Sequence, residues 1–363
     1  MRLVLHVGMG KTGTSTLQAE LTARHRQLAR QGVCYPVVGR SRNQSALNCL
    51  IRPVDRVPRQ FRTPDRREPA AMRAFGESFW ADLRRIVERS GADVTVISSE
   101  HFFYLDADEL SRLGDLLADQ FSEIRVVAYV RSPADYYVAV TQQRVRASHE
   151  IVPPASYRIP IRRCLERHRQ QFGDIVVRTY ERTALVGEDI VDDFASVAMP
   201  GVSLRRSKLG DVNVSLSAEA MCIMQRFRRA RFPDDNDVFN PETHRLLDAL
   251  ERVHERIPQT APRLTGGLAM LVTENHREDL DWLADELGVS FDLPDTASGA
   301  GPSPRGSSDD LSDVLDVTDE RINATLYALL AELTHRSAIQ TFASKIRRRA
   351  QTEMRWWLPE SLA

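Results

Sequence analysis

The chain has 363 residues, of which 42% are apolar, and at roughly 150 residues per domain this allows two to three domains or one large α/β domain with attachments. Its 49 lysines and arginines balance 50 aspartates and glutamates, so the formal charge of −1 gives no reason to expect a nucleic-acid partner. No apolar run reaches the ~20 residues of a transmembrane segment, and no signal-peptide pattern opens the chain. The four cysteines form no CxxC pair, which excludes a disulfide scaffold and favours a reducing, cytoplasmic location.

The first half of the chain alternates short β-branched runs with helical patterns. We expect strands at Arg2–Gly8, Val94–Ser98, Ile124–Val130 and Ile175–Tyr180. Between them, apolar residues at helical spacing predict helices at Met72–Arg89, Asp106–Gln120 and Ile161–Phe172. Continuous β-branched strands are typical of parallel sheets that are buried on both faces. The alternation therefore predicts an α/β fold with a P-loop-type parallel sheet flanked by helices, and ligands at the carboxyl ends of the strands.

From about Leu216 the pattern becomes largely helical. The expected helices are Ser217–Arg228, Pro241–Arg256, Thr273–Leu287 and Val317–Ala343. The Ser/Gly/Pro-rich composition of Pro294–Ser312 cannot bury apolar surface and predicts a flexible linker. We therefore expect an α/β domain at 1–293, a linker at 294–312 and a helical extension at 313–363. Its basic and aromatic end is expected to contact either a membrane surface or the protein itself.

A glycine-rich segment joins the first expected strand to the first expected helix. It reads Gly8-Met9-Gly10-Lys11-Thr12-Gly13-Thr14-Ser15-Thr16. Backbone N–H groups, a helix N-terminus, one ammonium and several hydroxyls converge there, which is the combination that binds phosphate. The spacing is not that of a Walker A loop, which requires glycine where Leu5 stands. The alternative is a tight strand-to-helix turn without a ligand, although the hydroxyls around Lys11 exceed what such a turn needs.

A second candidate anion site follows the strand expected at Ile124–Val130. There, Tyr129-Val130-Arg131-Ser132-Pro133 puts an arginine at the carboxyl end of a buried strand. A cation in that position is costly unless an anion pairs with it. The alternative is a solvated arginine beside a Ser-Pro helix cap. Together with the glycine loop, the segment predicts two anion sites in one crevice.

These two segments resemble those of the sulfotransferases that use 3′-phosphoadenosine 5′-phosphosulfate (PAPS), in particular their bacterial carbohydrate-sulfotransferase-like branch. Lys11-Thr12-Gly13-Thr14-Ser15 is similar to the loop that holds the 5′-phosphosulfate, and Val130-Arg131-Ser132-Pro133 to the segment that holds the 3′-phosphate. Three weaker similarities are Gly32–Pro36, Ile97–Glu100 and Asn213–Ser217. The resemblance covers roughly residues 1–293. One departure is Ala139, where the family usually has a serine that binds the 3′-phosphate.

The resemblance implies transfer of a sulfuryl group from PAPS to an acceptor hydroxyl of a carbohydrate or glycoconjugate. The product nucleotide is then 3′,5′-ADP, and no metal is required. The residues implied to bind PAPS are Gly10, Lys11, Thr12, Gly13, Thr14, Ser15, Thr16, Arg131 and Ser132. Lys11 is implied to stabilise the leaving phosphate. The general base is implied to be Glu100, with His101 as the second candidate.

Purely structural roles for these residues, and two other functions for the protein, stay open at this point. Glu100 is alternatively a carboxylate at a helix start, His101 a partly buried ring, and His6 a core histidine. A P-loop kinase would use ATP and Mg²⁺, but the loop spacing and the missing aspartate after a strand argue against it. A degenerate sulfotransferase fold would bind a nucleotide or a partner without turnover, which Ala139 favours.

Overall fold

The computed structural model describes residues 1–202, 204, 215–292 and 308–334, which fall into two compact units. The sheet unit contains the described residues of 1–136, 158–204 and 272–292. The helical unit contains those of 137–157, 215–271 and 308–334. Two of the boundaries between the units fall within helices in the sequence, one in α5 (Pro133–Arg144) and one in α10 (Gly266–Glu274). No helix among the described residues is both long and apolar enough to cross a bilayer.

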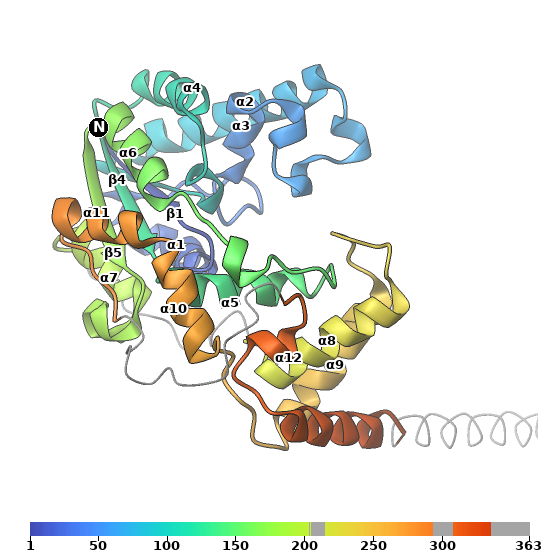
Figure 1. The fold of residues 1–363 in the computed structure, drawn as a ribbon. Helices are drawn as coiled ribbons and strands as arrows, with labels where there is room; N and C mark the ends of the chain where they lie inside the picture. Colours follow the sequence, from blue (N-terminus) through green and yellow to red (C-terminus); the bar gives the residue numbers. More distant parts are fainter. Residues whose placement is uncertain (203, 205–214, 293–307, 335–363) are drawn as a thin grey trace, which may run out of the picture. The chain divides into compact units, whose positions relative to one another are not determined.

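Five parallel strands form the sheet in the order β2-β3-β1-β4-β5 (Figure 1). They are β1 (Arg2–Gly8), β2 (Val33–Cys34), β3 (Val94–Ser98), β4 (Glu123–Val130) and β5 (Asp174–Thr179). The α/β class with a parallel sheet is thus confirmed, and β1, β3, β4 and β5 lie where the β-branched runs predict them. The strand β2 is not predictable from the sequence, because two residues are too few to show a strand pattern.

Helices flank the sheet on both faces. In the sheet unit they are α1 (Thr14–Ala29), α2 (Asn48–Ile51), α3 (Pro69–Ser90), α4 (Ala107–Ala118), α6 (Ile161–Phe172), α7 (Ile190–Ala198) and α11 (Arg277–Leu287). Short 3-10 helices lie at Ser45–Leu47, Val54–Arg56, Arg59–Phe61, Pro64–Arg66, Glu100–Phe102, Arg182–Ala184 and Val186–Glu188. The helices α1 and α7 contact each other, and α6 contacts α4, β4 and β5.

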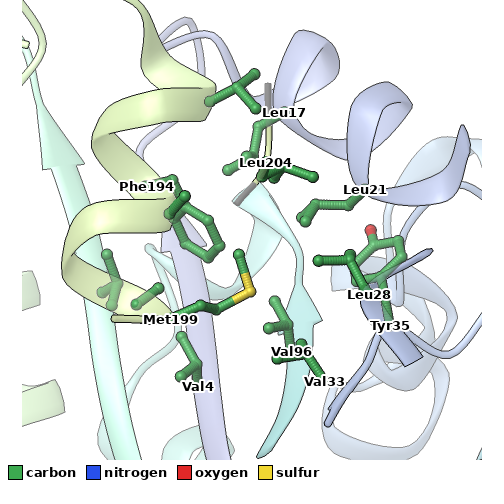
Figure 2. Close-up of a cluster of buried hydrophobic side chains, with 14 of the residues drawn as sticks. Val4, Leu17, Leu21, Leu28, Val33, Tyr35, Val96, Phe194, Met199 and Leu204 are labelled. Atoms are coloured by element: carbon green, nitrogen blue, oxygen red, sulfur yellow. The ribbon is translucent and has the colours of Figure 1, made fainter. Parts of the chain in front are cut away.

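The largest described core cluster lies between the sheet and the helices α1 and α7 (Figure 2). Leu17 and Leu21 of α1 meet Phe194 of α7 over Val4 and Val96 of the central strands, and all five side chains are buried. Burying such a side chain contributes about 1.5–3 kcal/mol, so this cluster fixes α1 against the sheet.

The predicted helix Thr273–Leu287 is interrupted in the structure. The helix α10 ends at Glu274 and α11 begins at Arg277. The reason is the side chain of His276, because its Nε2 accepts from the backbone N–H of Ile159 at 2.9 Å. Its Nδ1 therefore carries the proton and donates to the backbone oxygen of Val272 at 2.7 Å. Because Ile159 is far from His276 in the sequence, the spacing of apolar residues around His276 does not predict this contact or the break in the helix.

In the helical unit, α8 (Ala218–Arg231), α9 (Pro241–His254), the 3-10 helix Pro154–Ser156, the short α12 (Leu311–Val314) and a helix at 319–334 are described. Residues 308–312 lie inside the predicted linker, yet they are packed. Leu311 is fully buried, and its N–H donates to Gln225 Oε1 on α8 at 2.8 Å. The linker prediction is therefore wrong for residues 308–312. Residues 294–307 and the basic-aromatic end lie outside the described residues.

Candidate functional site

The glycine loop leaves the sheet between the ends of β1 and β4. The β1–β4 register shifts between His6 and Gly8, and the N–H of Met9 donates to the backbone oxygen of Tyr129 at 2.8 Å. Lys11 has φ 64°, a left-handed conformation that costs a non-glycine residue about 1–3 kcal/mol and is concentrated at ligand-binding sites. At the next left-handed position, Gly13, a Cβ atom would lie 3.0 Å from the ring of Tyr180. Only glycine fits there.

The start of α1 is open to an anion. Among the described residues no side chain caps α1 at Gly13, and its first turn has no acidic residue. Its first N–H groups and the positive end of its dipole are thus left for a ligand. The hydroxyl of Thr12 points inward and donates to the backbone oxygen of Met9 at 2.6 Å, whereas Lys11 and Ser15 are exposed. The loop hydroxyls therefore do not all face a ligand: that of Thr12 stabilises the loop itself, whereas that of Ser15 is accessible from solvent.

Arg131 follows the carboxyl end of β4. Its Nη1 donates to the backbone oxygen of Lys11 at 3.4 Å, which joins the two predicted anion-binding segments. No described carboxylate forms an ion pair with Arg131, so its charge is available to a ligand. Ser132 instead starts α5, because its Oγ donates to the carboxylate of Asp135 at 3.0 Å and accepts that residue's N–H at 3.3 Å. The hydroxyl of Ser132 therefore caps the helix α5, as expected if this segment is a Ser-Pro helix cap.

A cavity of about 410 Å³ opens beside Arg131. Its lining residues are Thr16, Arg131, Asp135, Tyr180, Glu181, Arg182, Leu185, Glu188, Asp189 and Ile190. Tyr180, Leu185 and Ile190 provide apolar surface, while Thr16 and Arg131 connect the cavity to the glycine loop. Cavities of this size hold small organic ligands. Tyr180 and the segment from Leu185 to Ile190 were not among the predicted site residues, although Tyr180 directly follows the end of β5.

One carboxyl group in this cavity has a shifted pKa. Burial raises the pKa of Glu181, and the negative charges of Asp292 and Asp135 add to the rise. A backbone hydrogen bond with Asp292 and the positive charge of Arg131 oppose it. Glu181 therefore holds a proton more readily than an exposed glutamate, which reduces the negative charge next to Arg131.

An ion pair between the partly exposed Arg178 and the buried Asp193 lies next to the segment that lines the cavity. Asp193 of α7 is fully buried, and its carboxylate accepts from the Arg178 guanidinium, from Tyr129 Oη at 2.7 Å and from the N–H of Val186 at 3.0 Å. Burial alone would raise the pKa of Asp193, but the hydrogen bonds, first of all that from Arg178, hold it below its usual value. The segment that begins at Leu185 is thereby tied to β4 and β5.

Glu100 stands two residues beyond the end of β3, next to the glycine loop. A Cβ atom at Gly8 would lie 3.0 Å from the Cα of Glu100, so the two backbones are in contact. The hydroxyl of Ser99 caps the 3-10 helix Glu100–Phe102 by accepting the N–H of His101 at 3.3 Å. The half-buried carboxylate of Glu100 has a different partner: its Oε2 accepts from Gln18 Nε2 of α1 at 3.2 Å.

The two histidines considered in the sequence analysis differ in burial. Burial lowers the pKa of His101, as does the positive charge of Arg52, while Glu100 opposes the shift. The ring of His101 is half-buried, and its lowered pKa favours the neutral form. Burial lowers the pKa of His6 to about 3, and its Nδ1 lies 2.8 Å from Ser98 Oγ. His6 also contacts Tyr129 and Phe194 edge to face, which confirms it as a core residue.

A pair of hydroxyls near the loop was missed by the sequence analysis. Tyr104 Oη and Tyr136 Oη lie 2.9 Å apart, and Tyr136 Oη is 4.0 Å from the position of a Cβ atom on Gly10. Burial raises the pKa of Tyr136, so its hydroxyl stays protonated and can donate. Ala139, further along α5, is buried.

The carboxyl ends of three adjacent strands thus bring together Glu100, the loop of Lys11 and Arg131 in the order β3, β1, β4. Among the described residues no group of three or more His, Cys, Asp or Glu side chains is arranged to bind a metal ion. Of the weaker sequence similarities, Asn213 and Val214 lie outside the described residues. No family model, curated protein or solved structure gives a significant match to this chain.

Proposed function

We propose that the chain is a PAPS-dependent sulfotransferase with a P-loop-type sheet, acting on a hydroxyl of a carbohydrate or glycoconjugate. The observation that carries the proposal is the sharing of one sheet edge by three segments of different chemistry. These are the loop of Lys11, the cation Arg131 and the carboxylate Glu100, at the ends of three adjacent strands. Their order in the sequence also resembles that of the family.

On the donor side, the loop N–H groups and the start of α1 bind the 5′-phosphosulfate of PAPS. Arg131 binds the 3′-phosphate, and the adjoining cavity accepts the adenosine between Tyr180 and Ile190. The bond between Arg131 and the backbone oxygen of Lys11 sets the distance between the two phosphate sites. The free, buried thiols of all four cysteines support a reducing, cytoplasmic location.

In the transfer, the acceptor oxygen attacks the sulfur in line with the departing 5′-phosphate, and the bond from sulfur to the bridging oxygen breaks. The ammonium of Lys11 compensates the charge that develops on the leaving phosphate. Glu100 takes the proton of the acceptor hydroxyl. One of its oxygens is bound by Gln18, and no described donor hydrogen-bonds to the other. The products are the sulfated acceptor and 3′,5′-ADP.

Ligand binding separates this function from that of a kinase. A ligand that binds the native state raises its stability by RT ln(1 + [L]/Kd). We expect 3′,5′-ADP to raise the melting temperature in the presence of EDTA. A Mg²⁺-dependent shift with ATP, without any shift from 3′,5′-ADP, would refute the proposal.

The role of Lys11 is tested by turnover. Lys11→Ala should lower kcat for PAPS-dependent sulfation by roughly 10²–10³, the scale of a lost group that stabilises charge in the transition state. The measurement is the rate of 3′,5′-ADP release with a saccharide acceptor panel. Unchanged kcat would show that another group stabilises the leaving phosphate.

A further inference from the structure

We propose that Gln18 is a positioning residue that aims the carboxylate of Glu100 at the acceptor and ties it to the helix that holds the donor. The inference rests on the proposed function, since it concerns the base of that reaction. Gln18 lies on α1 in the turn after the glycine loop, and its side chain is 4% exposed.

The orientation of its amide follows from its neighbours. The backbone N–H of Ser45 can only donate, and it lies 3.1 Å from Asn43 Oδ1. This directs Asn43 Nδ2 to Gln18 Oε1 at 3.2 Å. Gln18 Nε2 then has two N–H groups for two acceptors, Glu100 Oε2 at 3.2 Å and Ser98 Oγ at 3.1 Å. Every polar atom of the Gln18 side chain is used.

This arrangement links the two halves of the proposed reaction. The helix α1 begins at the loop that receives the phosphosulfate, and four residues further on it holds the base. A shift of the carboxylate relative to the donor loop would therefore require breaking the bond from Gln18. Displacing a reacting group by about 1 Å lowers rates by roughly 10²-fold, so such a link has catalytic value.

Gln44 offers a matched control. It is also a buried glutamine, 1% exposed, and it also bonds to Ser98. Its Oε1 accepts the backbone N–H of Ser98 at 2.7 Å, and its Nε2 donates to the backbone oxygen of Pro36 at 2.8 Å. A glutamine that serves only the core should behave like Gln44, whereas a positioning residue should act through Glu100.

The test is a double-mutant cycle on kcat, made with the full chain. Gln18→Met should lower kcat by roughly 10–10²-fold with the KM for PAPS unchanged, because the displaced carboxylate faces the acceptor. In the Glu100→Gln background the same change should alter kcat less than about twofold, since its target is already absent. Gln18→Asn, which keeps the amide but loses its reach, replaces Gln18→Met if that variant does not fold. Gln44→Met should lower the melting temperature and leave kcat within about twofold.

Equal losses of kcat from Gln18→Met in both backgrounds would overturn the proposal, as would a Gln44→Met variant with the same loss. A second measurement does not depend on turnover: the side-chain ¹⁵N amide signals of labelled glutamines. The Gln18 signal should shift in Glu100→Ala, and the Gln44 signal should not. A Gln18 signal that ignores Glu100→Ala refutes the positioning contact, whereas wild-type protein without any sulfation refutes the proposed function itself.

Discussion

The sheet unit and the helical unit differ in what holds them together. The sheet unit is built on strands that adjoin helices close to them in the chain, and one of its core clusters is the apolar layer between the sheet, α1 and α7. The helical unit is assembled from three separate stretches, joined by buried polar groups as well as by apolar ones. Glu219 accepts from Arg321 at 2.9 Å, and Glu332 accepts from Arg252 and Arg256, both at 2.8 Å. Local patterns predict the helices α8 and α9 of the helical unit, but not these contacts between its separate stretches.

The two units also differ in their proposed roles, since all the proposed catalytic side chains are in the sheet unit. The strongest test is Glu100→Gln, which keeps the shape but cannot accept a proton. We expect kcat for sulfation to fall by roughly 10²–10⁴, with little change in 3′,5′-ADP affinity. If Glu100→Gln stays active while His101→Ala loses activity, the base is His101.

Within the sheet unit, one of the buried charged side chains is Asp193, which pairs with the partly exposed Arg178. Asp193→Asn should lower the free energy of unfolding by about 3–5 kcal/mol near neutral pH. Because the pKa of Asp193 is lowered in the folded state, its contribution is present above the unfolded value and is lost as pH falls through the folded one. Urea denaturation at several pH values should therefore show the wild-type advantage shrinking below about pH 4. An advantage that does not depend on pH would contradict the ion pair.

In the helical unit, the segment at 308–334 should be part of the fold. Leu311→Ala should cost about 2–5 kcal/mol of unfolding free energy, since it removes a fully buried side chain. Differential scanning calorimetry measures this loss, and 3′,5′-ADP affinity at 25 °C serves as the control that should not change. A variant as stable as the wild type would restore the interpretation of 308–312 as a linker.

The smallest expected effect concerns Arg131. Arg131→Ala should weaken 3′,5′-ADP binding by about 1.5–3 kcal/mol, the value of a hydrogen bond to a charged group. Arg125→Ala is the control, because Arg125 lies near the other end of β4 and pairs with Asp174 at 2.6 Å. Isothermal titration calorimetry should separate the two variants. Equal affinities would mean that the 3′-phosphate binds elsewhere.

Much of the sheet unit was predictable, because β3 and α6 have the bounds that their apolar patterns indicate. The glycine loop, Glu100 and Arg131 were predictable as candidates because each lies within two residues of a strand end. Gln18 and Tyr136 were not, since a polar residue inside a helix has no local pattern that names its partner. The break at His276 and the packing of Leu311 depend likewise on residues far away in the sequence.

The central claim is that the chain transfers a sulfuryl group, and the most direct measurement is transfer of label from [³⁵S]PAPS to a panel of saccharide acceptors, with EDTA present. We predict a labelled saccharide formed in equal amount with 3′,5′-ADP, and roughly 10²–10³-fold less of it with Lys11→Ala at the same enzyme concentration and time. PAPS bound without transfer to any acceptor would contradict the claim and favour a protein that only binds the nucleotide.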